Sequence, residues 1–234
     1  MQADQVLVVP FTCELAACDH VVFFEDVLAD HLDIRAVHVG ADFKLGARGA
    51  STVSVMRAWG APRGIEVVGH DLLLDGVRPI CATRIRAHIA AGDMGSAAFE
   101  LGRHYMVRGR VGHGRGQGTG MGFPTANIEV GPTIQLPADG VYAGYALVGT
   151  SVWPAAINVG VPPMFAGDAA SARLEANLLG CSGDLYGAEL AIVFDRRLRA
   201  SEHFANIDEL VVAVRGDIEA VREQFGSGLL GVLP

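Results

Sequence analysis

Residues 104–129 read HYMVRGRVGHGRGQGTGMGFPTANIE, and they divide the chain into two kinds of pattern. Before them, apolar runs typical of strands alternate with segments typical of helices, which indicates an α/β unit. After them, short alternating runs at 105–111, 141–149, 172–180 and 188–194 are separated by Gly, Pro and Asp, as in an antiparallel barrel or sandwich. We therefore predict an α/β module over residues 1–103 and an all-β domain over residues 104–234.

The pattern also predicts individual elements on both sides of this boundary. In the first part we expect strands within 6–11, 34–43 and 65–74, and helices over 19–32, after Ser51, over 83–91 and in a shorter segment that ends at Gly102. Gly92 is expected to stop one helix and Asp93 to cap the next. At the end of the chain, Asn206 and Glu209 have capping-box spacing before a helix. Its apolar stripe comprises Ile207, Leu210, Val211, Val214, Ile218, Val221 and Phe225.

Composition excludes several classes of function. The formal net charge is −8 and Lys44 is the one lysine in the sequence, so we expect no nucleic-acid partner. Residues 140–167 carry no charge, but prolines and glycines interrupt them, so we expect no membrane span. The four cysteines form no C-x-x-C pair and no basic leader opens the sequence, which indicates a cytoplasmic protein.

The glycine run is the one biased segment, with glycine at every second position from Gly112 to Gly122. It fits neither G-x-G-x-x-G nor a Walker loop, which needs a lysine after its last glycine. A flexible polar loop is the ordinary interpretation of such a run. The alternative is a phosphate site, because main-chain N–H groups approach a polyphosphate closely where no Cβ intervenes.

The residues after the glycines favour the phosphate site. Pro124 fixes its own φ and makes its predecessor extended, so Thr125 and Asn127 are expected to project to one side of an extended chain. A hydroxyl and a carboxamide oxygen side by side are hard ligands suited to Mg²⁺. Turn chemistry explains either residue alone, but the combination beside a glycine run is rarer.

The segment VGHGRGQGTGMGFPTANI resembles the signature of the riboflavin kinase family. The resemblance continues through INVGVPPMF, RLEANLL, DLYG and RLRASEHFANIDEL, over essentially all of residues 104–225. It implies a six-stranded antiparallel β-barrel with a C-terminal helix. It also implies transfer of the ATP γ-phosphate to the 5′-hydroxyl of riboflavin, giving FMN, with Mg²⁺ as cofactor and ATP and riboflavin as small-molecule substrates.

The resemblance assigns roles to particular residues. Thr125 and Asn127 match the residues that hold Mg²⁺ and the ATP phosphates. Glu175 occupies the position of the catalytic glutamate, although a Glu on the polar face of a strand is more often a solvated surface residue. Flavin contacts are expected near Arg199 and Phe204, which are equally open to a structural role. The expected ATP-binding residues are Gly112, Gly114, Gly116, Gly118, Gly120, Gly122, Pro124, Thr125 and Asn127.

The first module resembles part of another enzyme. Residues 39–46, VGADFKLG, and 81–86, CATRIR, are similar to the later part of the FMN adenylyltransferase module of bacterial bifunctional FAD synthetases. The resemblance implies an incomplete Rossmann-like nucleotidyltransferase module, in which Arg84 and Arg86 match nucleotide-contacting arginines. The H-x-G-H loop of that module is not found in this sequence, so we expect FAD synthesis to be lost or very weak. A sheet edge left open by a missing first strand makes a homodimer through this module a further expectation.

The sequence also departs from the family pattern within the barrel, at Thr119, Met164, Asn177, Gly180 and Cys181. Three hypotheses follow from these matches and departures. The first is a kinase that makes FMN. The second is a non-catalytic flavin- or nucleotide-binding regulatory protein, and the third is a fragment of a bifunctional FAD synthetase.

Overall fold

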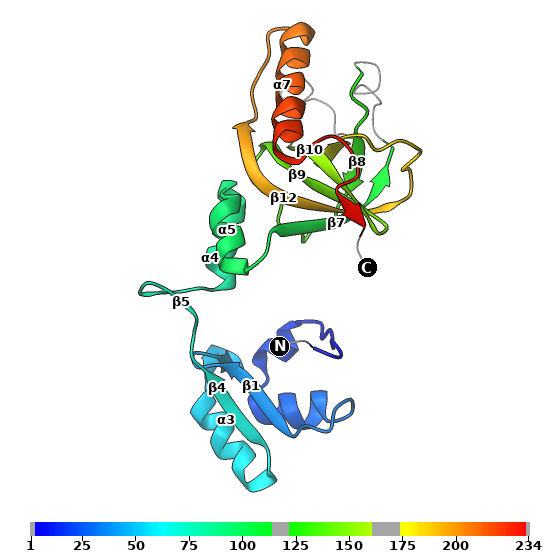
Figure 1. Cartoon of the computed structure of the whole chain (residues 1–234). Helices are drawn as coiled ribbons and strands as arrows, with labels where there is room; N and C mark the ends of the chain where they lie inside the picture. Colours follow the sequence, from blue (N-terminus) through cyan, green and yellow to red (C-terminus); the bar gives the residue numbers. More distant parts are fainter. Residues whose placement is uncertain (1–2, 114–121, 161–173, 233–234) are drawn as a thin grey trace. The chain divides into compact units, whose positions relative to one another are not determined.

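A computed structural model of the chain describes residues 3–113, 122–160 and 174–232 (Figure 1). The chain divides into two compact units, Met1–Ile80 and Cys81–Pro234, and each is described here by itself. The two helices that follow Ile80 therefore group with the barrel. The boundary expected at residue 103 marks the change from helices to strands and stays a prediction about domain organisation.

The first unit is built around a βαβ arrangement. Strand β1 (Ala36–Gly40) pairs in parallel with β4 (Glu66–His70), and helix α3 (Val53–Gly60) lies between them in the chain. Its core consists of Phe24, Val53, Met56, Trp59 and Val67. The remaining elements are α1 (Cys13–Ala17), α2 (His20–Val22), the π-helix η1 (Phe23–Leu28), the 3-10 helices η2 (Ala47–Gly49) and η3 (Ala61–Arg63), and the strands β2 (Lys44–Leu45), β3 (Ser51–Thr52), β5 (Leu74–Asp75) and β6 (Arg78–Pro79). The α/β prediction for this part of the chain is confirmed.

The strand predicted at residues 6–11 is wrong. These residues form no strand, and Val6, Val8 and Phe11 are each at least 80% exposed. An apolar run becomes a strand only where another strand satisfies its N–H and C=O groups, and within the described residues none pairs with this segment.

Two helices open the second unit, as the sequence predicts. Helix α4 (Ala82–Ala91) stops at Gly92, whose φ of 77° is left-handed. Helix α5 (Met94–Leu101) begins after Asp93, whose carboxylate accepts a hydrogen bond of 3.0 Å from the backbone N–H of Ser96. Helix α5 contacts strands of the barrel, and Met94 and Ala97 belong to the barrel core.

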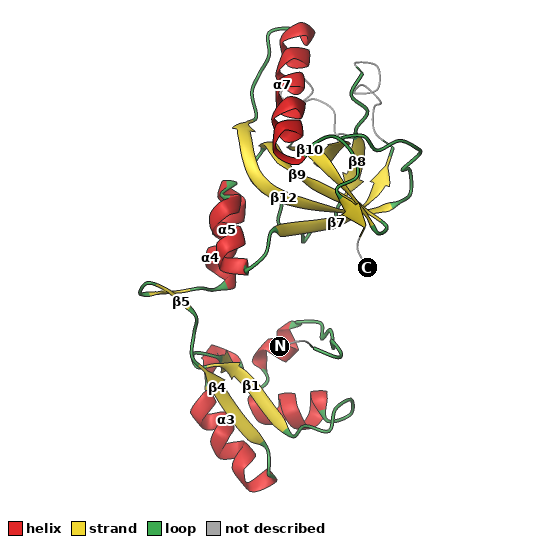
Figure 2. Ribbon diagram, in the orientation of Figure 1, coloured by secondary structure: helices red, strands yellow, loops and turns green. Residues whose placement is uncertain are grey.

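Six antiparallel strands close into the predicted barrel (Figure 2). Their order around the ring is β11, β8, β7, β12, β9 and β10, and the pairing of β10 with β11 closes it. The strands span Tyr105–Gly112 (β7), Ala126–Glu129 (β8), Gly140–Val148 (β9), Ser151–Val159 (β10), Leu174–Leu178 (β11) and Glu189–Ala200 (β12). A short strand, β13 (Gly231–Val232), adds to one end of β10.

The inside and the outside of the barrel are covered by different residues. Alternate residues such as Ile128, Ile157 and Leu174 are fully buried in the interior core. Helix α7 (Ile207–Phe225) packs outside, against β9 and β10, where Val221 meets Ala143. Helix α7 thus covers part of the outward face of β9 and β10.

The capping interaction predicted for this C-terminal helix is confirmed. Asn206 accepts a 2.9 Å hydrogen bond from the backbone N–H of Glu209. The carboxylate of Glu209 in turn accepts from the N–H of Ala205. The predicted stripe is wrong at its first position, because Ile207 is 59% exposed in the first turn.

No helix among the described residues has both the length and the apolarity needed to span a membrane.

Candidate active site

The predicted glycine run begins at the end of strand β7. A Cβ on Gly112 would lie nearest to the carboxylate end of the exposed Glu129 side chain, which can move aside. A Cβ on Gly109 of the same strand would instead collide with the backbone oxygen of Glu129, so the close approach of β7 and β8 requires glycine at position 109. Gly122 has a φ of 87°, a left-handed conformation that favours glycine. The other four predicted phosphate-binding glycines, Gly114, Gly116, Gly118 and Gly120, lie outside the described residues.

Strand β8 directs its side chains in alternation. Ala126 and Ile128 are buried in the barrel core, so Asn127 projects to the outer face. Thr125 lies two residues earlier and immediately precedes the strand, which continues this outward alternation. The expectation that these two polar side chains share one side agrees with the burial pattern of the strand.

Glu175 lies on the same outer face, on the neighbouring strand. It stands between Leu174 and Ala176, which are both fully buried. In the antiparallel register Glu175 is directly opposite Asn127 on β8. Side chains directly opposite in an antiparallel pair share a face, with Cβ atoms about 5 Å apart. The fold therefore brings together a carboxylate and an amide that are 48 positions apart in the sequence.

Two residues near Glu175 were not assigned to the site from the sequence. Asn158 on β10 is directly opposite Glu175 on its other side. Asn177 follows two residues after Glu175, and its side-chain N–H donates a 2.8 Å hydrogen bond to the carbonyl of Pro124. Asn177 thus fixes the backbone immediately before Thr125. The register could not be read from the sequence, although polar residues at alternate positions of β11 were a usable signal.

Arg199 and Phe204, the predicted flavin contacts, lie close together near the start of α7. The guanidinium carbon of Arg199 is 5.5 Å from the centroid of the Phe204 ring. Its Nε and Nη2 donate to the carboxylate of Asp217 on α7 at 2.8 to 3.2 Å. Asp217 is only 8% exposed. This pair joins β12 to α7, so Arg199 has a structural partner, and contact with a flavin remains a prediction.

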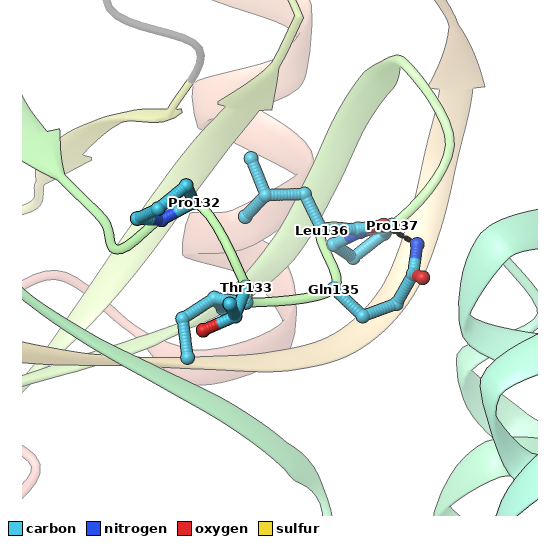
Figure 3. Close-up of a pocket in the computed structure, with 6 residues that line it drawn as sticks. Pro132, Thr133, Gln135, Leu136 and Pro137 are labelled. Atoms are coloured by element: carbon cyan, nitrogen blue, oxygen red, sulfur yellow. Dashed lines mark hydrogen bonds between the residues drawn. The ribbon is translucent and has the colours of Figure 1, made fainter. Parts of the chain in front are cut away.

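A pocket in the second unit lies away from these residues. It is lined by residues 132–137, in the loop between β8 and β9 (Figure 3). None of the predicted site residues lines it, so it gives no support to the site. Within the described residues, no group of three or more His, Cys, Asp or Glu side chains is suited to a metal ion. The expected Mg²⁺ ligands are of another kind, a hydroxyl and an amide oxygen.

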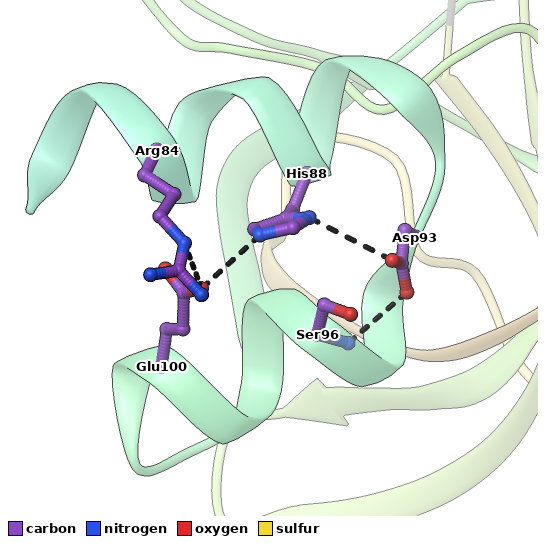
Figure 4. A network of polar contacts seen from close by, with 5 residues as sticks. All are labelled: Arg84, His88, Asp93, Ser96 and Glu100. Carbon is purple, nitrogen blue, oxygen red and sulfur yellow. Dashed lines mark hydrogen bonds and ion pairs between the residues drawn. The ribbon is translucent and has the colours of Figure 1, made fainter. Parts of the chain in front are cut away.

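Arg84, one of the two arginines expected to contact a nucleotide, belongs to a polar network between α4 and α5 (Figure 4). The other, Arg86, donates to the Thr83 hydroxyl at 3.3 Å. Nε of Arg84 is 2.7 Å from the carboxylate of Glu100, whose side chain is 1% exposed. Nε2 of His88 is 3.1 Å from the same oxygen. Hydrogen bonds from Ser96, through its side chain and then its backbone N–H, lower the pKa of Asp93 at the helix junction. Arg84 therefore helps to fix the two helices to each other.

Two histidines come from the parallel strands of the first unit, His38 from the middle of β1 and His70 from the end of β4. Nδ1 of His38 is 3.0 Å from Nε2 of His70, and their rings stack with centroids 5.2 Å apart. These imidazoles come from two strands and do not reproduce a single H-x-G-H loop.

The six-stranded antiparallel barrel followed by a C-terminal helix is the fold that the resemblance to riboflavin kinases implies. The riboflavin kinase family model matches residues 101–225, and the FAD synthetase model matches residues 1–84. The chain belongs to the family of bifunctional riboflavin kinases/FMN adenylyltransferases and carries a riboflavin kinase domain.

Individual relatives agree with this assignment. The bifunctional riboflavin kinase/FMN adenylyltransferase of Pseudomonas fluorescens is 34% identical over 220 residues, which cover 94% of this chain and 70% of the relative. The protein of the same name from Escherichia coli strain K12 is 33% identical over 224 residues, covering 95% and 71%. A crystal structure of a macrolide-efflux protein from Streptococcus pneumoniae superposes with a TM-score of 0.75 at 28% identity, covering 91% of this chain and 67% of that one.

Proposed function

We propose that this chain transfers the γ-phosphate of ATP to the 5′-hydroxyl of riboflavin, giving FMN and ADP. The observation that carries the proposal is the register of β8 and β11, which puts Asn127 opposite Glu175 on the outer face of the barrel. Thr125 lies two residues before Asn127, on the same face. A hydroxyl, an amide oxygen and a carboxylate on one face supply what phosphoryl transfer needs, because the reaction depends mainly on positioning and charge neutralisation.

Each residue has a distinct role in this mechanism. The oxygens of Thr125 and Asn127 are of the hard kind that Mg²⁺ prefers, so these two residues would hold the metal beside the ATP phosphates. When bound, Mg²⁺ neutralises the charge of the phosphates. Asn177 holds the carbonyl of Pro124 and so keeps Thr125 in place.

Glu175 acts on the other substrate. Its carboxylate accepts a hydrogen bond from the 5′-hydroxyl of riboflavin and so orients the oxygen toward the γ-phosphorus. As the new O–P bond forms and the bond to ADP breaks, the carboxylate takes the hydroxyl proton. Arg199 and Phe204 are proposed to lie beside the flavin ring, where an aromatic or apolar cover would desolvate it.

The test is a chromatographic assay that resolves riboflavin, FMN and FAD. With riboflavin and MgATP, the wild-type chain should form FMN, and Glu175→Gln should reduce kcat about 100-fold or more. The matched control is Glu189→Gln, which changes an exposed carboxylate on β12 in the same way and should leave kcat unchanged. Full activity in Glu175→Gln would reject the proposed base. Tight riboflavin binding without any turnover would instead favour a regulatory flavin-binding protein.

The first unit provides a second candidate activity, since the FAD synthetase model matches residues 1–84. We propose that these 234 residues transfer adenylyl groups to FMN weakly or not at all, because the H-x-G-H motif is not among them. Incubation with FMN and MgATP tests this directly. Rapid FAD formation would refute the proposal and show that other residues face the phosphates. Sedimentation of the same sample would test the predicted homodimer.

A further inference from the structure

The side chain of Asn158, on β10, lies on the same face of the sheet as Glu175 and outside the barrel core. Its strand neighbours Ile157 and Val159 are buried in the barrel, so the side chain of Asn158 projects outward. Two residues earlier, Ala156 on the same face packs against the cluster under α7. Asn158 therefore lies just beyond that cluster on the outer face of β10, beside Glu175.

The register places Asn158 beside the proposed base. Asn158 is directly opposite Glu175, and Glu175 is directly opposite Asn127, so three polar side chains form one row across β10, β11 and β8. Directly opposed side chains have Cβ atoms about 5 Å apart, which is within reach of a hydrogen bond between an amide and a carboxylate. Glu175 consequently has a neutral amide on each side along the sheet.

The amide of Asn158 is held in place by the backbone two residues later. Its Nδ2 donates to the carbonyl of Gly160 at 3.3 Å, which uses one of its two N–H groups and leaves the other for a second acceptor.

We propose that Asn158 is a positioning residue for Glu175 in riboflavin phosphorylation, an inference that rests on the proposed function. Its second N–H orients the carboxylate toward the hydroxyl that is to be deprotonated. Because the amide is neutral, it does this without opposing the ionised state of the base. Asn158 is directly opposite Glu175 on β10, which places its amide within reach of the carboxylate.

Steady-state kinetics of position 158 variants test the role. Asn158→Ala should lower kcat about 10-fold with the KM for MgATP unchanged, since orientation of the base is lost and nucleotide binding is not. Asn158→Ser, which keeps a donor, should recover part of that loss. Ser151→Ala, at the far end of β10, is the control and should leave kcat unchanged.

A measurement without turnover separates this inference from the proposed function. The ¹³C carboxyl signal of Glu175, identified by its loss in Glu175→Gln, is compared by NMR between wild type and Asn158→Ala at one pH, with thermal melts to confirm folding. A shifted carboxyl signal in folded Asn158→Ala that is not seen in Ser151→Ala supports the inference even if no variant makes FMN, in which case only the proposed function fails. An unchanged signal, or wild-type kcat in folded Asn158→Ala, would overturn it.

Discussion

Replacing Asp217 by Asn tests whether Arg199 is mainly a structural residue of the barrel. Three donor–acceptor distances of 2.8 to 3.2 Å join the guanidinium to the Asp217 carboxylate, and the two side chains are 20% and 10% exposed. Removing one partner of a buried pair leaves an uncompensated charge, which costs about 3 kcal/mol at the more exposed end of the usual range. For a unit of about 150 residues this corresponds to a fall in Tm of about 6–12 °C.

Thermal and urea unfolding of the full chain measure this loss. Glu223→Gln, an exposed change of the same kind on the same helix, should alter stability by less than about 0.5 kcal/mol. The double variant Arg199→Met with Asp217→Leu should regain most of the stability, because it leaves no unpaired charge. If Asp217→Asn is as stable as wild type, the pair does not hold α7 to β12. The same conclusion follows if the double variant loses as much stability as Arg199→Met and Asp217→Leu lose separately when their effects are added.

Three further predictions follow from single contacts. Gly92→Ala should destabilise the second unit by about 2 kcal/mol in urea unfolding, because φ is left-handed and a Cβ would lie 2.7 Å from the Tyr142 hydroxyl oxygen; a neutral effect would contradict that packing. Asn177→Ala, which frees the carbonyl of Pro124, should raise the KM for MgATP about 5-fold, and an unchanged KM would contradict its role. The lowered pKa of Asp93 gives stability that is complete above its ordinary value of 3.8 and is lost as pH falls through the lower folded value. Melts between about pH 5 and about pH 2 should therefore show wild type losing its advantage over Asp93→Asn.

Local signals were the part of the fold that the sequence predicted well. The alternation at 105–111 and 141–149 became β7 and β9, and the caps at Asp93 and Asn206 were found as expected. These features depend on neighbouring residues alone, since side-chain alternation and helix capping are short-range effects. The apolar run at 6–11 had the same kind of signal but no partner strand, and it did not become a strand.

The candidate site was predicted less completely, for a physical reason. Thr125 and Asn127 were selected by their spacing after Pro124 and Glu175 by a resemblance, whereas the places of Asn158 and Asn177 become visible only through the register of β8, β10 and β11. That register is set by closure of the ring, which depends on pairing between distant segments. The structural partner of Arg199 was likewise hidden, because Asp217 lies on a helix 18 positions later.

The collision between a side chain at position 109 and the backbone oxygen of Glu129 has a consequence for mutational surveys. Any replacement of Gly109 is expected to reduce the yield of folded protein before it affects catalysis. A scan scored on FMN output alone would count this glycine among the nucleotide contacts. Scoring abundance alongside turnover would separate the residue that lets two strands approach from those that serve a ligand.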